Sequence, residues 1–232
     1  MKTFVIGDIH GGYKALLQCL ERSNFNKETD TLISLGDICD GWSQVREVFD
    51  ELLSIKNLIF IIGNHDYWTL SWMNSGEKPL IWTSQGGQHT LESYGNNPEN
   101  VPSEHRQLLQ NGNVCYLDEK KRLFVHGGID PNKSLDRQDI QEVMWDRDLI
   151  TNARNKHNQK PNYKYGKGFD EIFVGHTSIT QFGKRVPTKF CNVWGLDTGG
   201  GWEWKLSIMD VDTHEYWQSD VVSSLYPNDV PR

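Results

Sequence analysis

The amino-acid sequence predicts an α/β protein, on three observations in the N-terminal part of the chain. Short apolar runs rich in β-branched and aromatic residues, typical of buried strands, occur at residues 4–6, 32–35 and 58–62. Between these runs, leucine and valine recur at helical spacing in residues 16–20 and 45–53. The resulting β-α-β-α-β order indicates a sheet whose strands are at least partly parallel.

The later parts of the chain are less regular. Glycine, proline, asparagine and serine interrupt the region 76–112, so we expect it to form a cap or long loop, and we expect residues 150–170 to form a second substrate loop. Apolar runs return at residues 122–125 and 171–174. From residue 189 to 217, several β-runs separated by glycines predict strands that close a second sheet.

Length, charge and cysteine usage narrow the class of protein. A chain of 232 residues without repeats or linkers predicts a single domain over 1–232. The formal net charge of −7 argues against bulk electrostatic binding to nucleic acid, yet it is compatible with a phosphate-bearing substrate, because bound divalent cations reverse the local sign. No apolar stretch reaches the roughly 20 residues of a membrane span, so no membrane partner is expected. The N-terminus shows no signal peptide and the four cysteines are scattered, which favours a reduced, cytoplasmic protein.

Five of the apolar runs end in side chains that bind metal ions. These side chains are Asp8 and His10, Asp37, Asn64, His126 and His176. In open α/β sheets ligands bind outside the carboxyl ends of the strands, so these residues are expected to meet in one crevice. A single Asp or His after a strand is usually a turn residue. Here, however, five strand ends coincide with flanking glycines, and four of the eight histidines lie at such ends, namely His10, His65, His126 and His176.

The kinds of side chain at these ends favour a dinuclear metal centre. Mixed Asp, His and Asn ligands without thiolates suit Mn, Fe or Zn. A carboxylate at Asp37 that bridges two ions about 3.5–4 Å apart would give the arrangement used for in-line phosphoryl displacement. A bridging water would be deprotonated at neutral pH, and the resulting hydroxide would be the nucleophile.

Five motifs resemble those of the calcineurin-like metallophosphoesterase superfamily, and within it the phage-type and bacterial Ser/Thr protein phosphatases. They are Gly7-Asp8-Ile9-His10-Gly11 for GDxHG, Gly36-Asp37-Ile38-Cys39-Asp40-Gly41-Trp42 for an altered GDxxDRG, Gly63-Asn64-His65-Asp66 for GNH followed by an acid, His126-Gly127-Gly128 for HGG and Gly175-His176-Thr177 for GHT. The order and spacing agree over residues 7 to 177. The resemblance therefore covers most of the chain.

The resemblance implies both a fold and a set of roles. The fold is a metallophosphoesterase-type β-sandwich of two mixed sheets flanked by helices, with the dinuclear site at the carboxyl ends of strands. The first metal would be held by Asp8, His10 and Asp37, and the second by the shared Asp37 with Asn64, His126 and His176. The implied cofactors are two divalent ions, with Mn preferred and Fe, Zn, Ni or Mg as alternatives.

The resemblance also implies the catalytic groups. His65 would be the general acid that protonates the leaving alkoxide, and Asp40 would orient it, because a carboxylate beside an imidazole raises its pKa and fixes its tautomer. Arg147, whose planar fork matches two phosphate oxygens, would clamp the phosphate together with Asn64.

One departure from the family pattern concerns phosphate binding. Gly41 stands where the family usually has an arginine, so one cationic contact is missing or comes from elsewhere. Arg46, one helical turn further on, is a candidate substitute, although an ordinary exposed helix position describes it better. Asp66 replaces the usual Glu and is expected to support the ligands rather than to bind metal.

Two other groups of residues have both a structural and a functional interpretation. Most of the nine tryptophans are expected to pack in the core or under a lid, with Trp42 and Trp68 retained as candidates for the pocket rim. The basic stretch 154–167, with two interleaved tyrosines, is typical of a solvated loop. As an alternative, it overhangs the crevice and guides an anionic substrate.

Three functional hypotheses follow from the sequence. The preferred one is hydrolysis of a phosphomonoester, on a phosphoprotein or a small phosphoester, by a metal-bridging hydroxide. The second keeps the fold but takes a dinucleoside polyphosphate, a nucleotide or an RNA phosphodiester, and the basic stretch and Gly41 motivate it. The third is a non-catalytic metal-binding scaffold. Retention of both His65 and Asp40 argues against this third hypothesis, because a scaffold has no need of an acid and its orienting carboxylate.

Overall fold

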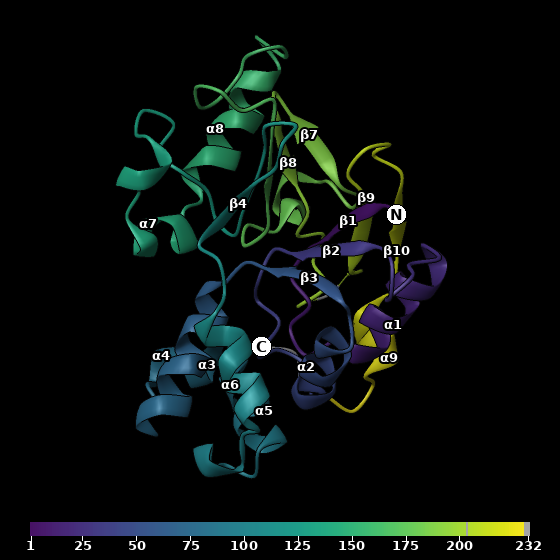
Figure 1. The fold of residues 1–232 in the computed structure, drawn as a ribbon, viewed down its shortest axis with the longest axis vertical. Coiled ribbons are helices and arrows are strands. Elements are labelled where there is room, and N and C mark those ends of the chain that lie inside the picture. The colour runs from purple at the N-terminus through teal and green to yellow at the C-terminus, as the bar shows by residue number, and fades with distance from the viewer. Residues whose placement is uncertain (203, 230–232) are drawn as a thin grey trace.

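A computed structural model of the protein describes residues 1–202 and 204–229. The described chain forms two five-stranded sheets that face each other and carry helices on their outer sides (Figure 1). This confirms the predicted sandwich of two mixed sheets flanked by helices.

The first sheet has the order β10-β9-β1-β2-β3. Its parallel part consists of β1 (Thr3–Ile6), β2 (Thr31–Ser34) and β3 (Asn57–Phe60). These strands are joined through α1 (Tyr13–Arg22) and α2 (Val45–Leu53). The predicted β-α-β-α-β start is therefore confirmed.

The second sheet has the order β4-β5-β6-β8-β7. Its strands are β4 (Cys115–Leu117), β5 (Arg122–Val125), β6 (Glu171–Val174), β7 (Thr188–Phe190) and β8 (Val193–Gly195). The strands β5, β6 and β8 run parallel, and β4 and β7 are antiparallel at the two edges.

The expectation that residues 189–217 all close the second sheet is wrong in part. β7 and β8 join that sheet, but β9 (Ser207–Asp210) and β10 (Tyr216–Gln218) join the first one, where β9 pairs antiparallel with β1. β9 extends the first sheet beyond β1, with Met209 in the space between the sheets and Ile208 in the core on the helical side. The chain thus crosses from one sheet to the other after β8.

The space between the two sheets is filled by apolar side chains from both. The buried residues of this layer are Val5, Ile33, Leu35, Ile61, Phe124, Phe173, Leu196, Met209 and Val211. Phe124 and Phe173 stack with ring centres 4.8 Å apart. Since the central strands β1, β2, β5 and β6 are also buried on their other face, they are continuous apolar runs rather than alternating ones.

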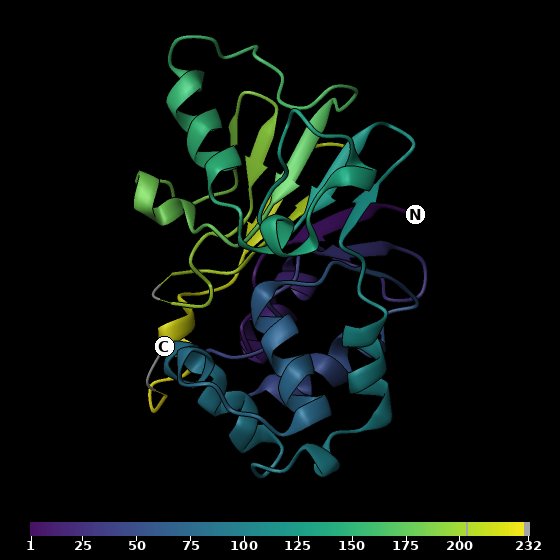
Figure 2. The same cartoon turned by 90° about the vertical axis from the view of Figure 1, so that its left-hand side faces the viewer.

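The region 76–112 is mostly helical, so of the two expected forms, a cap or a long loop, the long loop is wrong. It follows α3 (Asn64–Ser75) and contains α4 (Leu80–Trp82), the π-turn η1 (Thr83–Gly87), α5 (Gln88–Ser93), the 3-10 turn η2 (Pro98–Asn100) and α6 (Ser103–Gln110). These helices gather beneath the first sheet beside α2 (Figures 1 and 2). The buried residues of the region 76–112, among them Trp82, Leu91 and Tyr94, share one core with α1 and α2.

The outer side of the second sheet carries α7 (Ile140–Trp145) and α8 (Asp148–His157), whose apolar residues form a separate core with β5 and β6. The short elements η3 (Leu135–Arg137), η4 (Ile179–Phe182) and α9 (Val222–Leu225) complete the fold. Residues 150–157 thus belong to a helix, and only 158–170 are irregular. Across the described residues, no helix combines the length and the apolar character that crossing a bilayer requires.

Candidate active site

The carboxyl ends of five strands from both sheets bring the predicted metal-binding side chains together. Ligand atoms of Asp8, His10 and Asp37 lie within 4.8 Å of one another, and those of Asp37, His126 and His176 do the same. All of these residues are buried, and Asp37 belongs to both groups. Asn64 joins the second group, because its Oδ1 lies 3.1 Å from Nε2 of His126.

The backbone at these strand ends turns sharply through the left-handed region. His10, Asp37, Asp40 and His176 have φ values of 48°, 49°, 66° and 58°. Such values cost a non-glycine residue roughly 1–3 kcal/mol each and persist only where the surroundings enforce them. The adjacent glycines give the carboxylates room: a Cβ on Gly63 would overlap Oδ1 of Asp37. Strain and close approach are therefore concentrated at the candidate ligands.

Two imidazoles are oriented by backbone carbonyls behind them. Nδ1 of His10 lies 3.0 Å from the Cys39 carbonyl oxygen, and Nδ1 of His126 lies 2.7 Å from that of Leu35. Because a carbonyl only accepts, each Nδ1 must donate, and each Nε2 is turned toward Asp37, at 3.6 Å for His10 and 3.4 Å for His126. This is the usual outer support of a metal-binding histidine.

Burial and neighbouring charges shift the pKa values of the candidate ligands. Burial and the nearby carboxylates of Asp197 and Asp37 raise the pKa of Asp8 well above its usual value. Burial lowers the pKa of His126, but the charges of Asp37 and Asp8 outweigh it and raise the pKa to about 9.

His176 behaves in the opposite way. Burial and the positive charges of His126 and Arg147 lower its pKa to about 2, so its imidazole stays neutral. Its Nε2 is buried without a hydrogen-bond partner among the described residues. A neutral, unpartnered imidazole nitrogen beside two buried carboxylates fits a divalent cation, and the donor set as a whole fits two.

Asp66 lies behind the ligands and holds the loop that carries Asp37. Its carboxylate accepts hydrogen bonds from the backbone N–H groups of Asp37 at 2.7 Å, Ile38 at 2.9 Å, Cys39 at 3.3 Å and Gly63 at 2.9 Å. Burial and the charge of Asp37 raise the pKa of Asp66 to about 6. This position matches the supporting role expected for Asp66.

His65 and Asp40 form a close buried pair beside the metal-binding residues. Nδ1 of His65 lies 2.6 Å from Oδ2 of Asp40. The Asp40 carboxylate also accepts from Nε1 of Trp82 at 2.8 Å and from Oγ1 of Thr90 at 2.6 Å. Sequence reasoning missed Thr90 and assigned Trp82 to packing. The helical region 76–112 thus fixes the orientation of Asp40 rather than merely covering the site.

A cavity of about 410 Å³ opens onto this constellation. Its walls include Asp37, Asn64, His65, Trp68, Ile81, Gln85, Trp145, Arg147, His176, Ser178, Gln181 and Trp202. Arg147 is the single Arg or Lys among these described residues, and its Nη1 donates to the His176 carbonyl oxygen at 3.2 Å. We call this space the reaction cavity.

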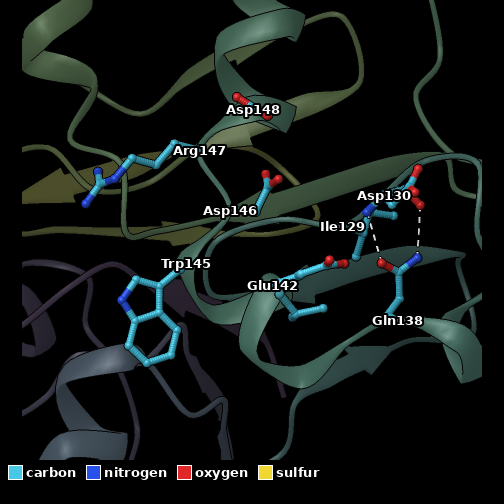
Figure 3. A pocket seen from close by; sticks show the side chains of 9 residues that line it. Ile129, Asp130, Gln138, Glu142, Trp145, Asp146, Arg147 and Asp148 are labelled. Atoms are coloured by element: carbon cyan, nitrogen blue, oxygen red, sulfur yellow. Dashed lines mark hydrogen bonds between the residues drawn. The ribbon is translucent and has the colours of Figure 1, made fainter.

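A second pocket of about 440 Å³ shares Trp145 and Arg147 with the reaction cavity. Its carboxylates come from Asp130, Glu142, Asp146 and Asp148. Figure 3 shows the Arg147 guanidinium pointing away from these carboxylates. The positive charge of Arg147 therefore faces the reaction cavity and not the carboxylates of the second pocket.

Three candidates for contact with the substrate do not line the reaction cavity: Trp42, which was retained as a rim candidate, and Arg46 and the basic stretch 154–167, for which this role was the less favoured alternative. Trp42 is fully buried, because its indole N–H donates to the Gly200 carbonyl oxygen at 2.8 Å. Arg46 is exposed on α2 and does not line the reaction cavity, so it does not replace the missing arginine. The basic stretch 154–167, all of it described, contributes no residue to the wall of the cavity. Trp68, by contrast, does line it.

The structure explains why an arginine cannot simply be restored at Gly41. This residue has φ of +77°, and a Cβ would lie 2.8 Å from Cβ of His10. We expect Gly41→Arg to lower the free energy of unfolding by about 1–3 kcal/mol from the backbone conformation alone, and to reduce rather than improve turnover. Urea unfolding and steady-state kinetics would check this, and a variant with normal stability and a lower KM would contradict it.

Comparison with known proteins agrees with this geometry. The sequence profile described as calcineurin-like phosphoesterase matches residues 1–198. The serine/threonine-protein phosphatase 2 of Salmonella typhimurium is 28% identical over 216 residues, which cover 90% of this chain and 92% of that protein. A symmetrical bis(5'-nucleosyl)-tetraphosphatase of Buchnera aphidicola is 30% identical over 133 residues, which cover 56% of this chain but only 46% of that relative.

A solved structure ascribed to a diadenosine tetraphosphatase superimposes with a TM-score of 0.68 at 17% identity, over 95% of this chain and 93% of that one, which shows a shared fold. Since the family profile spans most of the sequence and the fold agrees, the chain belongs to the calcineurin-like phosphoesterase family.

Proposed function

We propose that the protein hydrolyses phosphomonoesters, with a phosphorylated Ser or Thr side chain as the preferred kind of substrate. As a member of its family it is a hydrolase of phosphoester bonds. The observation that carries the proposal is the pair of buried ligand groups that share Asp37, next to the His65–Asp40 pair in one cavity. The similarity to serine/threonine-protein phosphatase 2 over nearly the whole of both chains supports the choice of substrate.

The family uses dinuclear divalent metal sites, and we assign the ligands of this chain to two ions. Asp8, His10 and Asp37 would hold one ion, and Asp37, Asn64, His126 and His176 the other. We propose Mn, with Fe, Zn, Ni or Mg as alternatives, because imidazole and oxygen ligands without thiolates suit these ions. When bound, the ions supply positive charge that stabilises the phosphate and lowers the pKa of water.

The surrounding residues would bind and protonate the substrate. Arg147 and Asn64 would hold phosphate oxygens, since both line the reaction cavity. His65 would donate a proton to the leaving alkoxide. Asp40 is itself held by Trp82 and Thr90. Its carboxylate would accept the Nδ1 proton of His65 and so leave Nε2 as the nitrogen that protonates the substrate.

Hydrolysis of p-nitrophenyl phosphate tests the proposal directly. With Mn added we expect turnover, and with excess EDTA we expect its loss, because charge stabilisation by the ions contributes several kcal/mol to lowering the barrier. Readdition of Mn should restore turnover. Turnover that persisted after complete removal of the metal would overturn the proposed mechanism.

A second substrate class, the dinucleoside polyphosphates, has its own support. Relatives named as symmetrical bis(5'-nucleosyl)-tetraphosphatases and a related fold point to it, and Trp68, Trp145 and Trp202 line the reaction cavity. The basic stretch 154–167 no longer supports it, because it lies off the cavity. Phosphopeptides and dinucleoside tetraphosphates assayed side by side would separate the two classes by kcat/KM.

The protein's partners and location are also proposals. We propose a phosphoprotein or small phosphoester as the partner, with no membrane partner and no bulk binding of nucleic acid, consistent with the net charge of −7. All four cysteines are free, which supports a reducing, cytoplasmic location. The non-catalytic scaffold is disfavoured, because the His65–Asp40 pair is held in place by two further hydrogen bonds.

A further inference from the structure

A third cavity, of about 400 Å³, adjoins the reaction cavity and is not needed for the phosphate chemistry. Its lining residues are Thr180, Gly183, Arg185, Gly199, Trp202 and Trp204. Trp202 also lines the reaction cavity, and η4 (Ile179–Phe182) contributes Gln181 to the reaction cavity and Thr180 to this one. We call it the outer cavity. A substrate that fills the reaction cavity therefore meets the outer cavity across the Trp202 side chain.

The turn that carries Trp202 is fixed against the metal-binding side of the reaction cavity. The Gly200 carbonyl oxygen accepts the indole N–H of buried Trp42 at 2.8 Å. A Cβ on Gly201 would overlap the His10 ring, so the backbone of the turn lies directly against a candidate ligand. On the far side, the backbone N–H groups of Trp202 and Trp204 donate to the Gly199 carbonyl oxygen at 3.1 and 2.9 Å. Trp202 is thus placed by the same packing that places the candidate ligand His10.

The outer cavity combines aromatic faces with a positive charge. Trp202 is 40% exposed, so part of its surface faces solvent. The guanidinium carbon of Arg185 lies 4.0 Å from the centre of the Trp204 ring, a cation–π contact, and its N–H groups are the kind of donor that binds phosphate. The described lining residues include no carboxylate. Such a surface suits an anionic ligand with an aromatic ring.

We propose that the outer cavity is a substrate subsite that takes the nucleoside end of a nucleoside polyphosphate. The base stacks on Trp202, and Arg185 binds a phosphate beyond the one in the reaction cavity. Every nucleotide carries an aromatic ring next to its phosphates, whereas a phosphopeptide offers one only where its sequence supplies it. The inference rests on the proposed phosphoesterase function of the same site, and it concerns the second of the two substrate classes proposed for that site.

Calorimetric titration of the Mn-supplied protein with ADP and with pyrophosphate tests the subsite without relying on turnover. ADP is pyrophosphate esterified with adenosine, so the two probes differ in the nucleoside and in the one ionisable oxygen that the ester uses. We expect the wild type to bind ADP more tightly than pyrophosphate. Trp202→Ala should lower the affinity for ADP roughly 5- to 100-fold, the range for one base–aromatic stack, and should remove its advantage over pyrophosphate. Trp202→Phe, which keeps an aromatic face, should retain most of it.

Arg185→Gln should lower the affinity for ADP and weaken its dependence on salt. Arg154→Gln is the matched control, because its guanidinium lies 5.5 Å from the Phe182 ring and it lines neither cavity; its ADP affinity should equal that of the wild type. Equal binding of ADP and pyrophosphate by the wild type, or unchanged ADP affinity in Trp202→Ala, would overturn the subsite. A Trp202→Ala protein that lost phosphopeptide turnover selectively and kept its ADP binding would also overturn the subsite. Absence of wild-type p-nitrophenyl phosphate turnover would instead count against the proposed function.

Discussion

Replacing Asp37 with asparagine is expected to release the metal ions and to reduce turnover of p-nitrophenyl phosphate by about a thousandfold or more. Asp37 is the one residue common to both candidate ligand groups, and its two oxygens face Nε2 of His126 and Nε2 of His10. An amide keeps one acceptor oxygen and no charge, so neither ion is held as before, and several kcal/mol of electrostatic stabilisation are lost. Metal content per chain and kcat/KM measure the two effects.

Asp210→Asn is a matched control for losing a buried carboxylate. Asp210 is 4% exposed and accepts backbone hydrogen bonds from Asp212 and Thr213 in the turn after β9, away from the reaction cavity. We expect it to lower stability and to leave the metal content unchanged. An Asp37→Asn protein that kept two ions and more than a tenth of the wild-type turnover would show that Asp37 does not bridge them.

The second large effect is expected for His65→Asn, which should lower kcat about 100- to 10,000-fold while the protein keeps its metal. His65 is absent from both candidate ligand groups, so its loss leaves those groups intact. Asp40 remains held by Trp82 and Thr90, so the pocket should keep its shape. Metal analysis and steady-state kinetics on the same samples would separate a loss of chemistry from a loss of ions.

The leaving group provides the sharper criterion for an acid. A poor leaving group such as an alkoxide needs a proton, whereas p-nitrophenolate needs little help. The deficit of His65→Asn should therefore be much larger for an alkyl or phosphoserine ester than for p-nitrophenyl phosphate. Equal deficits for both esters would assign His65 to phosphate binding rather than to proton transfer.

Much of the fold and most of the candidate site could be predicted because they depend on local sequence. The strands at 122–125 and 171–174 were predicted with the bounds that the structure gives, since a buried parallel strand must be apolar on both faces. The residues predicted to bind metal follow such strands directly, and parallel strands that end at one edge bring them together.

What could not be predicted depends on pairing between distant parts of the chain. Nothing in residues 207–218 shows that β9 pairs with β1 rather than with β8, because a short apolar strand fits either sheet. Likewise, Trp82 and Thr90 reach Asp40 from 42 and 50 positions away. From the sequence, Trp82 is predicted to be a packed aromatic residue, and nothing near Thr90 indicates a role in the site.

The places of two tryptophans in the fold also could not be predicted from the sequence. Trp42 is the last residue of the second motif, which suggested the rim, yet its ring packs inward and stacks on Tyr226 with ring centres 5.4 Å apart. The sequence pattern does not predict a role for Trp202, although it lines two cavities. The glycine run before it was the available signal, because glycines allow a turn to lie directly against the His10 ring.

The left-handed backbone at His10, Asp37, Asp40 and His176 bears on any attempt to engineer this protein for heat resistance. Glycine would relax each of these positions, so a screen that rewards only survival at high temperature favours changes that erase the chemistry. Thermotolerant variants of this chain should accordingly be selected under a simultaneous demand for catalysis.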